Sequence, residues 1–281
     1  MNPFQRCLNL AIYEWRRALA KKKFLVLVII TFALQILVFL SFNFIFANPP
    51  EGLDLQGVKT TMWIVGILGT QELFMPLIAI VIASGSMSEE YEHGTADILL
   101  SKPITKMEYL TGKYIGGLTL SSFVIALTTT LGVALAYVFF GPQNPIHVVP
   151  VIYLAVVYAN LLFFSLSFMF SEVFRRTTLT ILAAIGIFVS SIIISSYLAI
   201  MHAMTQEQLY LNISRILPNW SVSNFPGFVA SKIVTLENNP FLSLPSGNLQ
   251  LAAAIIAVYT LICIIISTMK LRRSDITKKV S

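Results

Sequence analysis

The stretch FLVLVIITFALQILVFLSFNFIF (residues 24–46) decides the class of fold, because its 23 residues carry no charge. An α-helix rises about 1.5 Å per residue, so about 20 apolar residues cross the roughly 30 Å hydrocarbon core of a bilayer. Four other runs have the same character, and a further run is interrupted by Gln71 and Glu72. These five cover residues 62–85, 114–140, 148–170, 179–201 and 249–269. The sequence predicts an all-α polytopic membrane protein with six transmembrane helices.

The composition agrees with this class of protein. Hydrophobic residues make up 56% of the chain and charged residues 11%, and the mean hydropathy is +0.79. A soluble domain of this size needs about twice that density of charge. The first apolar run starts at Phe24 and is too long for the core of a cleavable signal peptide. Cys7 and Cys263 lie at opposite ends of the chain, which argues against a disulfide framework or a cysteine metal site.

The basic residues predict the orientation. If the six runs cross the membrane, 16 of the 19 lysines and arginines fall on one side, and only Lys59, Arg215 and Lys232 fall on the other. Basic residues favour the cytoplasmic side, and an even number of spans returns the chain to it. We therefore expect both termini in the cytoplasm and the protein in the cell membrane. The pI of about 9.3 is explained by this topology, so we expect no nucleic-acid partner.

The segment before the first span, residues 1–23, predicts an amphipathic helix in the membrane surface. Asn2 and Pro3 suit its first positions. One apolar stripe runs along it at steps of three or four residues: Phe4, Leu8, Ile12, Trp15 and Leu19. Such a helix buries its apolar stripe at the headgroup boundary, where its arginines meet anionic lipid. An ordinary basic flank before a span would explain the charges but not the stripe. Residues 24–281 then form the transmembrane domain.

The joint after the second run, Ser86–Pro103, is unusual because it is acidic on the side where basic residues dominate. Gly94 allows a sharp turn, Thr95 can cap a short helix, and Pro103 ends it. Thr105 and Glu108 form a capping-box pattern that starts the next helix. The joint thus reads either as a short helix that presents apolar residues to a partner surface, which we favour, or as a solvated loop. Its acidic and apolar residues are Glu89, Glu90, Glu92, Asp97, Ile98, Leu99 and Leu100.

Four motifs in this region resemble the signature of ABC-2 type transporter permeases. They are MPLIAI (75–80), EEYEHGT (89–95), LLSKPI (99–104) and GK (112–113). The chain is especially similar to the branch that includes the permease for nitrous-oxide reductase maturation. The motifs occur in the family's order and spacing, although they cover only residues 75–113. The span count, the amphipathic start and the long segment 202–248 also agree with the family.

The resemblance implies a permease subunit that forms a dimer, of like or unlike chains, and binds separate ABC ATPase subunits at its cytoplasmic face. Residues 86–103 would be the coupling helix, with Glu89, Glu90, Glu92 and Asp97 facing basic ATPase residues and Ile98, Leu99 and Leu100 filling a groove. A second, lesser contact would come from Glu172, Arg175 and Arg176. The segment 202–248 would hold extracellular helices, partly re-entrant. Export is the commoner role in the family, and we expect it here.

The chain itself shows no sequence for binding nucleotide. Its only Gly-Lys pair is Gly112-Lys113, and Met107 stands where a phosphate-binding loop needs its first glycine. We therefore expect no enzymatic activity and no cofactor in this chain, with ATP and magnesium held by the partner ATPase. His93, His147 and His202 are scattered over different joints, so we expect no metal site.

Glu72 supports an alternative function. A carboxylate within a span is costly and marks a functional site by default, so the chain could instead be an ion-coupled secondary transporter. No inverted repeat supports that alternative. The residue lies either deep in the membrane or in a wetted outer vestibule, and Pro76 is expected to kink its helix. The spacing Gly112-x-x-x-Gly116 allows close helix packing, but it also arises often by chance.

Overall fold

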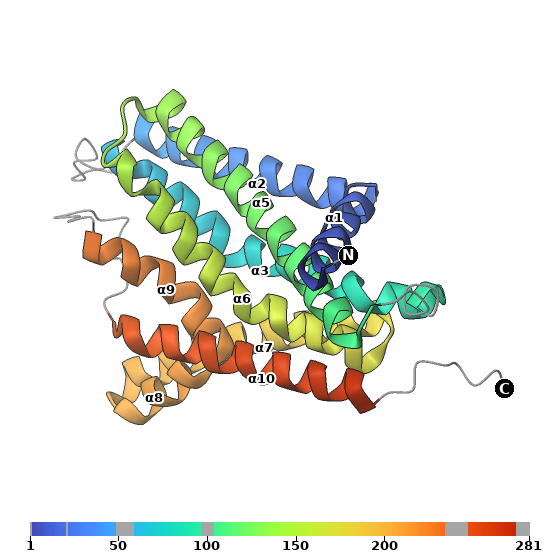
Figure 1. Ribbon diagram of the computed structural model, residues 1–281. Helices are drawn as coiled ribbons and strands as arrows, with labels where there is room; N and C mark the ends of the chain where they lie inside the picture. Colours follow the sequence, from blue (N-terminus) through green and yellow to red (C-terminus); the bar gives the residue numbers. More distant parts are fainter. Residues whose placement is uncertain (1, 21, 49–58, 97–103, 234–246, 274–281) are drawn as a thin grey trace.

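A computed structural model describes residues 2–20, 22–48, 59–96, 104–233 and 247–273 (Figure 1). This part of the chain is helical and contains no strand. Six of its helices are long and apolar enough to cross a membrane, which confirms the predicted all-α polytopic architecture.

The described helices follow one another along the chain. The order is α1 (Pro3–Leu19), α2 (Lys22–Ala47), the 3-10 turn η1 (Lys59–Thr61), α3 (Met62–Glu92), α5 (Lys106–Phe140), η2 (Ile146–Val148), α6 (Val149–Phe174), α7 (Thr177–Thr205), α8 (Gln208–Ile216), α9 (Pro218–Ile233) and α10 (Leu249–Arg273). The six candidate spans are carried by α2, α3, α5, α6, α7 and α10.

The centre of the bundle is formed by α3 and α6, which pack against each other (Figure 1). In their apolar windows 61% and 56% of the residues are buried, against 17–33% in the other four candidate spans. The core around them is rich in large side chains, including the buried Trp63, Phe163, Phe164 and Phe168. Most residues on α2, α7 and α10 are instead available to lipid or to another chain.

Helix α3 is longer than a membrane requires. Its 31 residues extend about 46 Å, so it continues beyond a bilayer core of about 30 Å. The prediction that the joint begins at Ser86 is therefore wrong, because Ser86–Glu92 form the last two turns of α3. The turn comes where Gly94 was expected to make it, with a φ of +69°. The capping box of Thr105 and Glu108 at the start of α5 is also confirmed.

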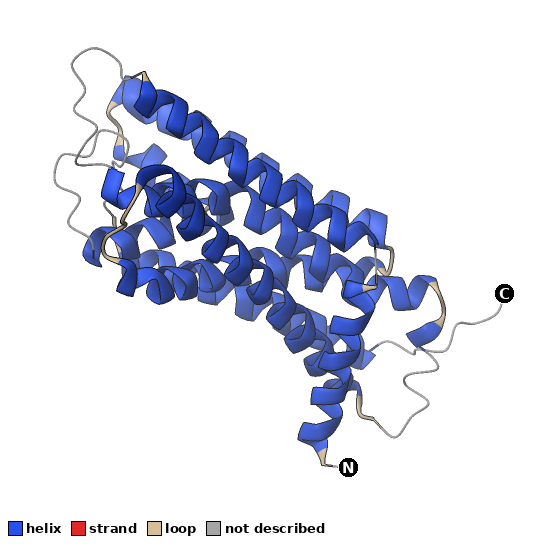
Figure 2. Cartoon of the chain, turned by 90° about the horizontal axis from the view of Figure 1, so that it is seen from above, coloured by secondary structure: helices blue, strands red, loops and turns tan. Residues whose placement is uncertain are grey.

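Helix α1, which begins at the marked N-terminus in Figure 2, packs along the first half of α5. The two backbones come close because α5 presents glycines there. A Cβ atom on Gly112 would lie 2.7 Å from Leu10 Cβ, and one on Gly116 would lie 2.8 Å from Ala11 Cα. The Gly-x-x-x-Gly spacing thus makes a helix contact. Most of the apolar stripe of α1 points away from the bundle, with Phe4 77% and Leu8 50% exposed, but Trp15 packs against Phe123 of α5.

The segment 202–248 contributes the end of α7 and the helices α8 and α9, together with residues outside the described ranges. Helix α9 packs against α6, α7 and α10 and reaches α3. Figure 1 shows α8 and α9 at the end of the bundle opposite the C-terminus. We call this the α8–α9 end. The opposite end, where α1 meets the C-termini of α3, α6 and α10, is the basic end.

Candidate functional site

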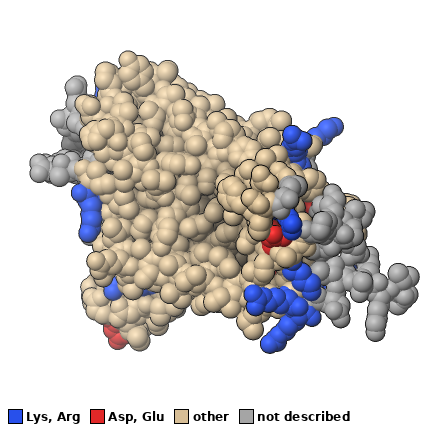
Figure 3. Space-filling model, viewed as in Figure 1, with Lys and Arg blue, Asp and Glu red and all other residues tan. Residues whose placement is uncertain are grey.

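The basic end carries most of the visible charge. In Figure 3 lysine and arginine side chains gather at this end, and the wide flank between the two ends shows almost none. The last turn of α10 contributes Lys270, Arg272 and Arg273. The motif-bearing end of α3, the start of α5 and the turn between α6 and α7 lie here, so those predicted coupling residues that the structure describes are at this end.

Four charged side chains form a cluster inside the basic end. Lys113 on α5 binds the carboxylates of Glu14 on α1 and Glu90 on α3 through its Nζ. Arg17 on α1 contacts the same two carboxylates, at 3.0 Å each. The Tyr109 hydroxyl donates to the second oxygen of Glu90. We call Glu14, Arg17, Glu90 and Lys113 the charge cluster.

The charge cluster is buried and has no net formal charge. The side chains of Lys113, Glu90 and Glu14 are 0%, 2% and 5% exposed, and that of Arg17 is 16% exposed. Burial raises the pKa of Glu14, although Lys113 and Arg17 oppose it. Burial acts to lower the pKa of Arg17. The carboxylates of Glu14 and Glu90 have a larger, opposite effect, so the pKa of Arg17 lies above its usual value. The contacts between two acids and two bases offset part of the large cost of removing each charge from water.

The position of Glu90 corrects one expectation. Glu90 was predicted to face basic residues of an ATPase, but its side chain lies inside this chain and contacts Lys113, Arg17 and Tyr109. The acidic stretch is therefore not a uniformly exposed surface. Glu90 instead fastens the end of α3 to α1 and α5.

The next two residues of the motif fasten α3 to the turn between α6 and α7. The Tyr91 hydroxyl donates to Glu172 Oε2 at 2.8 Å, and the Arg175 guanidinium lies 4.5 Å from the centre of the Tyr91 ring. The Glu92 carboxylate accepts the Thr177 N–H at 2.9 Å and the Thr177 hydroxyl at 2.8 Å. The two predicted contact regions are thus joined to each other.

The second predicted contact also needs correction. Glu172 is 0% exposed, so its carboxylate serves the internal contact with Tyr91 and cannot meet a partner surface. Arg175 is partly buried, with a side chain 30% exposed, and it adopts a left-handed backbone at φ 53°. Arg176 is exposed. Of the three residues predicted to form the second contact, it is the one that does not take part in the internal contact with Tyr91.

The other predicted coupling residues fall into two groups. Gly94 and Thr95 lie in the turn after α3, and the Thr95 hydroxyl is 3.5 Å from the Glu90 carbonyl oxygen. Glu89 is partly exposed and lines the cavity described next. The second group lies outside the described residues and comprises Asp97, Ile98, Leu99, Leu100 and Pro103.

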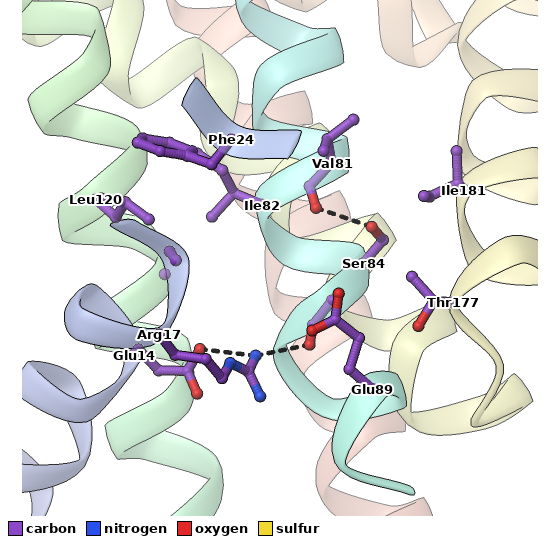
Figure 4. A pocket seen from close by; sticks show the side chains of 13 residues that line it. Glu14, Arg17, Phe24, Val81, Ile82, Ser84, Glu89, Leu120, Thr177 and Ile181 are labelled. Carbon is purple, nitrogen blue, oxygen red and sulfur yellow. Dashed lines mark hydrogen bonds and ion pairs between the residues drawn. The ribbon is translucent and has the colours of Figure 1, made fainter. Parts of the chain in front are cut away.

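A cavity of about 80 Å³ lies above the charge cluster, between α1, α2, α3, α5 and α7. Figure 4 shows Glu14, Arg17 and Glu89 at one end of it and Phe24, Ile82 and Leu120 at the other. Thr177 and Ile181 line it from the side of α7. The cavity therefore offers a charged floor beside an apolar wall, which suits a molecule with a polar head and an apolar body.

Glu72 lies ten residues into α3, about 15 Å along its axis from Met62. The residue is exposed on the surface of the chain, and it also lines a small cavity shared with α6 and α9. Within the described residues no group of three or more histidine, cysteine, aspartate or glutamate side chains could hold a metal ion.

The charge cluster was not predicted from the sequence, although one signal pointed to it. Glu14 is the only acidic residue among the first 23, within a segment rich in lysine and arginine. A lone acid on a basic amphipathic helix indicates a specific internal partner. Here that partner is Lys113, the lysine of the Gly112-Lys113 pair in the family signature.

Two comparisons with known proteins show what this chain is similar to. The family described as "ABC-2 family transporter protein" matches residues 8–276. The chain is also 23% identical over 156 residues to the uncharacterized protein YhcI of Bacillus subtilis (strain 168). That match covers 49% of this chain and 50% of YhcI, so it spans about half the length of either protein.

Proposed function

Since the chain belongs to the ABC-2 family of transporter proteins and is therefore the membrane subunit of an ABC transporter, we propose that it exports a substrate by coupling to a separate ATPase. ABC-2 family membership implies an ABC ATPase partner in general, and the permease itself is not the catalytic subunit. In this proposal the ATPase holds ATP and magnesium and binds the basic end. The basic end faces the cytoplasm, the protein lies in the cell membrane, and a second permease chain completes a dimer.

One observation carries the proposal: polar contacts hold the motif-bearing end of α3 to three other helices. Glu90 holds it to α1 and α5, and Glu92 holds it to α7 through Thr177. Along the chain, α5 is the next described helix after this end of α3, and the predicted coupling segment lies between them in the sequence. A displacement of that connection by an ATPase would therefore be passed to four helices at once.

The corrected positions change which residues make the expected contact. Glu90 and Glu172 are buried and act inside the permease. The remaining candidates are Asp97 and the apolar residues Ile98, Leu99 and Leu100, together with the exposed Arg176. Burying one leucine in a partner groove contributes roughly 1.5–3 kcal/mol, whereas an exposed ion pair contributes about 0.2–1 kcal/mol. The leucines are therefore proposed to supply most of the binding free energy.

The cavity above the charge cluster supports export rather than import. It lies at the basic end, which the distribution of lysine and arginine assigns to the cytoplasm. Its apolar wall of Phe24, Ile82 and Leu120 would receive the apolar part of a substrate that arrives from that side. A substrate with a polar head would place the head beside Arg17 and Glu14.

The test is to purify the permease with the ABC ATPase encoded nearest to its gene. We expect the wild-type chain to retain that ATPase, and Leu99→Ser with Leu100→Ser to lose at least tenfold of it while staying in the membrane. Leu209→Ser is the matched control, because Leu209 is 61% exposed on α8 at the other end. Equal retention of the ATPase by the double variant would assign the leucines to the permease's own packing and remove this basis for the proposal.

A further inference from the structure

A second, smaller cavity lies between α3, α6 and α9. Its volume is about 10 Å³, which is about the room that one water-sized particle needs. Four polar side chains from three helices line it, namely Gln71, Glu72, Asn160 and Ser223. Its other walls are apolar. It therefore concentrates polar atoms in a part of the bundle where such atoms are costly.

Two of these side chains leave a carbonyl oxygen without a partner. Asn160 Nδ2 donates to the Val156 carbonyl oxygen at 2.9 Å, and Gln71 Nε2 donates to the Thr129 hydroxyl at 2.9 Å. The carbonyl oxygens of the same two side-chain amides, Asn160 Oδ1 and Gln71 Oε1, have no hydrogen-bond partner among the described residues. Both residues are nearly buried, at 3% and 4% exposure. Buried acceptors of this kind are normally satisfied.

Prolines add backbone oxygens at the same place. Pro76 lies four residues after Glu72 in α3, and Pro226 lies four residues after Val222 in α9. A proline has no N–H, so the carbonyl four residues before it loses its helical donor. The two carbonyls affected belong to Glu72 and Val222, and both residues line the cavity. Each of the two helices therefore lacks one backbone hydrogen bond at the residue that lines the cavity.

The groups that meet here are mostly acceptors, and one of them carries a negative charge. Among the described residues Glu72 forms no ion pair with a lysine, arginine or histidine. A water molecule has two hydrogens and leaves the charge uncompensated. Hard cations prefer oxygen ligands, and divalent ions usually require more carboxylates than this cavity supplies.

We propose that Glu72, Gln71, Asn160 and Ser223 bind a single monovalent cation between α3, α6 and α9. The ion neutralises Glu72 and joins α9 to the two central helices of the bundle. Interrupted helices that direct free carbonyls at a cation provide such sites in other membrane proteins. A bound ion that only stabilises the fold explains why a carboxylate lies within a span. Glu72 then does not require the alternative function of an ion-coupled secondary transporter.

The experiment is a titration of the purified full-length chain with NaCl, and separately with KCl, while choline chloride keeps the ionic strength constant. A ligand that binds only the folded state raises the unfolding temperature in a saturable way. We expect saturation with at least one of the two ions for the wild-type chain. The Glu72→Gln variant should lose this response, and Glu207→Gln, an exposed carboxylate outside the site, should keep it.

The variant also separates the proposal from simple misfolding. In choline alone Glu72→Gln should unfold at a temperature no lower than that of the wild type, because it removes an unneutralised charge. A direct measurement with radioactive sodium or rubidium should show one site per chain, with affinity reduced at least tenfold in Asn160→Leu. A cavity that holds only water would give no saturable response for either ion. That result, or an unchanged response in Glu72→Gln, overturns the proposal.

Discussion

The charge cluster makes a quantitative prediction for Lys113→Met. This substitution leaves Glu14 and Glu90 with Arg17 as their only basic partner, and the two carboxylates are 5% and 2% exposed. Breaking a buried pair by removing one partner costs about 3–5 kcal/mol, because the other charge stays buried. For a chain of this size each kcal/mol lowers the unfolding temperature by about 2–4 °C. We therefore expect Lys113→Met to unfold roughly 6–20 °C below the wild type.

The double variant Lys113→Met with Glu90→Gln should recover most of this loss. It leaves the contact between Arg17 and Glu14 at 3.0 Å intact and restores a neutral cluster. Unfolding of the purified chains can be followed with a thiol-reactive dye, because Cys263 is only 4% exposed in the folded state. If the double variant is as unstable as the sum of the two single variants, the charges are not coupled. The internal role assigned to Glu90 would then be refuted.

Other contacts at the basic end and the topology give further tests. Gly116→Ala should cost about 1–3 kcal/mol by forcing α1 away from α5, whereas Gly186→Ala, with open space around it, should be neutral or slightly stabilising in the same thermal assay. Glu92→Ala removes two hydrogen bonds from the start of α7 and should lower stability by about 1 kcal/mol. In a chain without native cysteines, an impermeant thiol reagent added outside intact cells should label a cysteine at Asn212 but not at Asn9. Labelling at Asn9 would contradict the proposed orientation.

The helices of the bundle were predictable because a charge-free run of about 20 residues is a local property. The stretch 24–46 and the other apolar runs can be recognised from their own residues, without knowing which helices pack against them. Their ends were less predictable, as α3 shows. Glu89 and Glu90 look like the start of a polar joint, yet α3 continues to Glu92. A polar helix end is stable when its charges find partners elsewhere in the fold, and composition does not reveal those partners.

The candidate site was predictable in location but not in its contacts. The motif at 89–95 predicts a site at the end of α3, and the charge cluster includes Glu90 of that motif. However, Lys113 and Glu14 are 99 residues apart in the sequence, and the lone acid at position 14 does not identify Lys113 as its partner. The same holds for Tyr91 and Glu172, which are 81 residues apart. Exposure of an acidic residue is a tertiary property, so the assignment of Glu90 and Glu172 to a partner surface failed.

The central claim is that a separate ATPase binds the basic end of this chain. The most direct measurement attaches a photoreactive group at Arg176→Cys, and at Lys232→Cys as the matched control, in cysteine-free chains copurified with the ATPase. Both positions are exposed and basic, but they lie at opposite ends of the bundle. We expect a cross-link to the ATPase from position 176 and none from position 232. A cross-link from position 232 alone would contradict it.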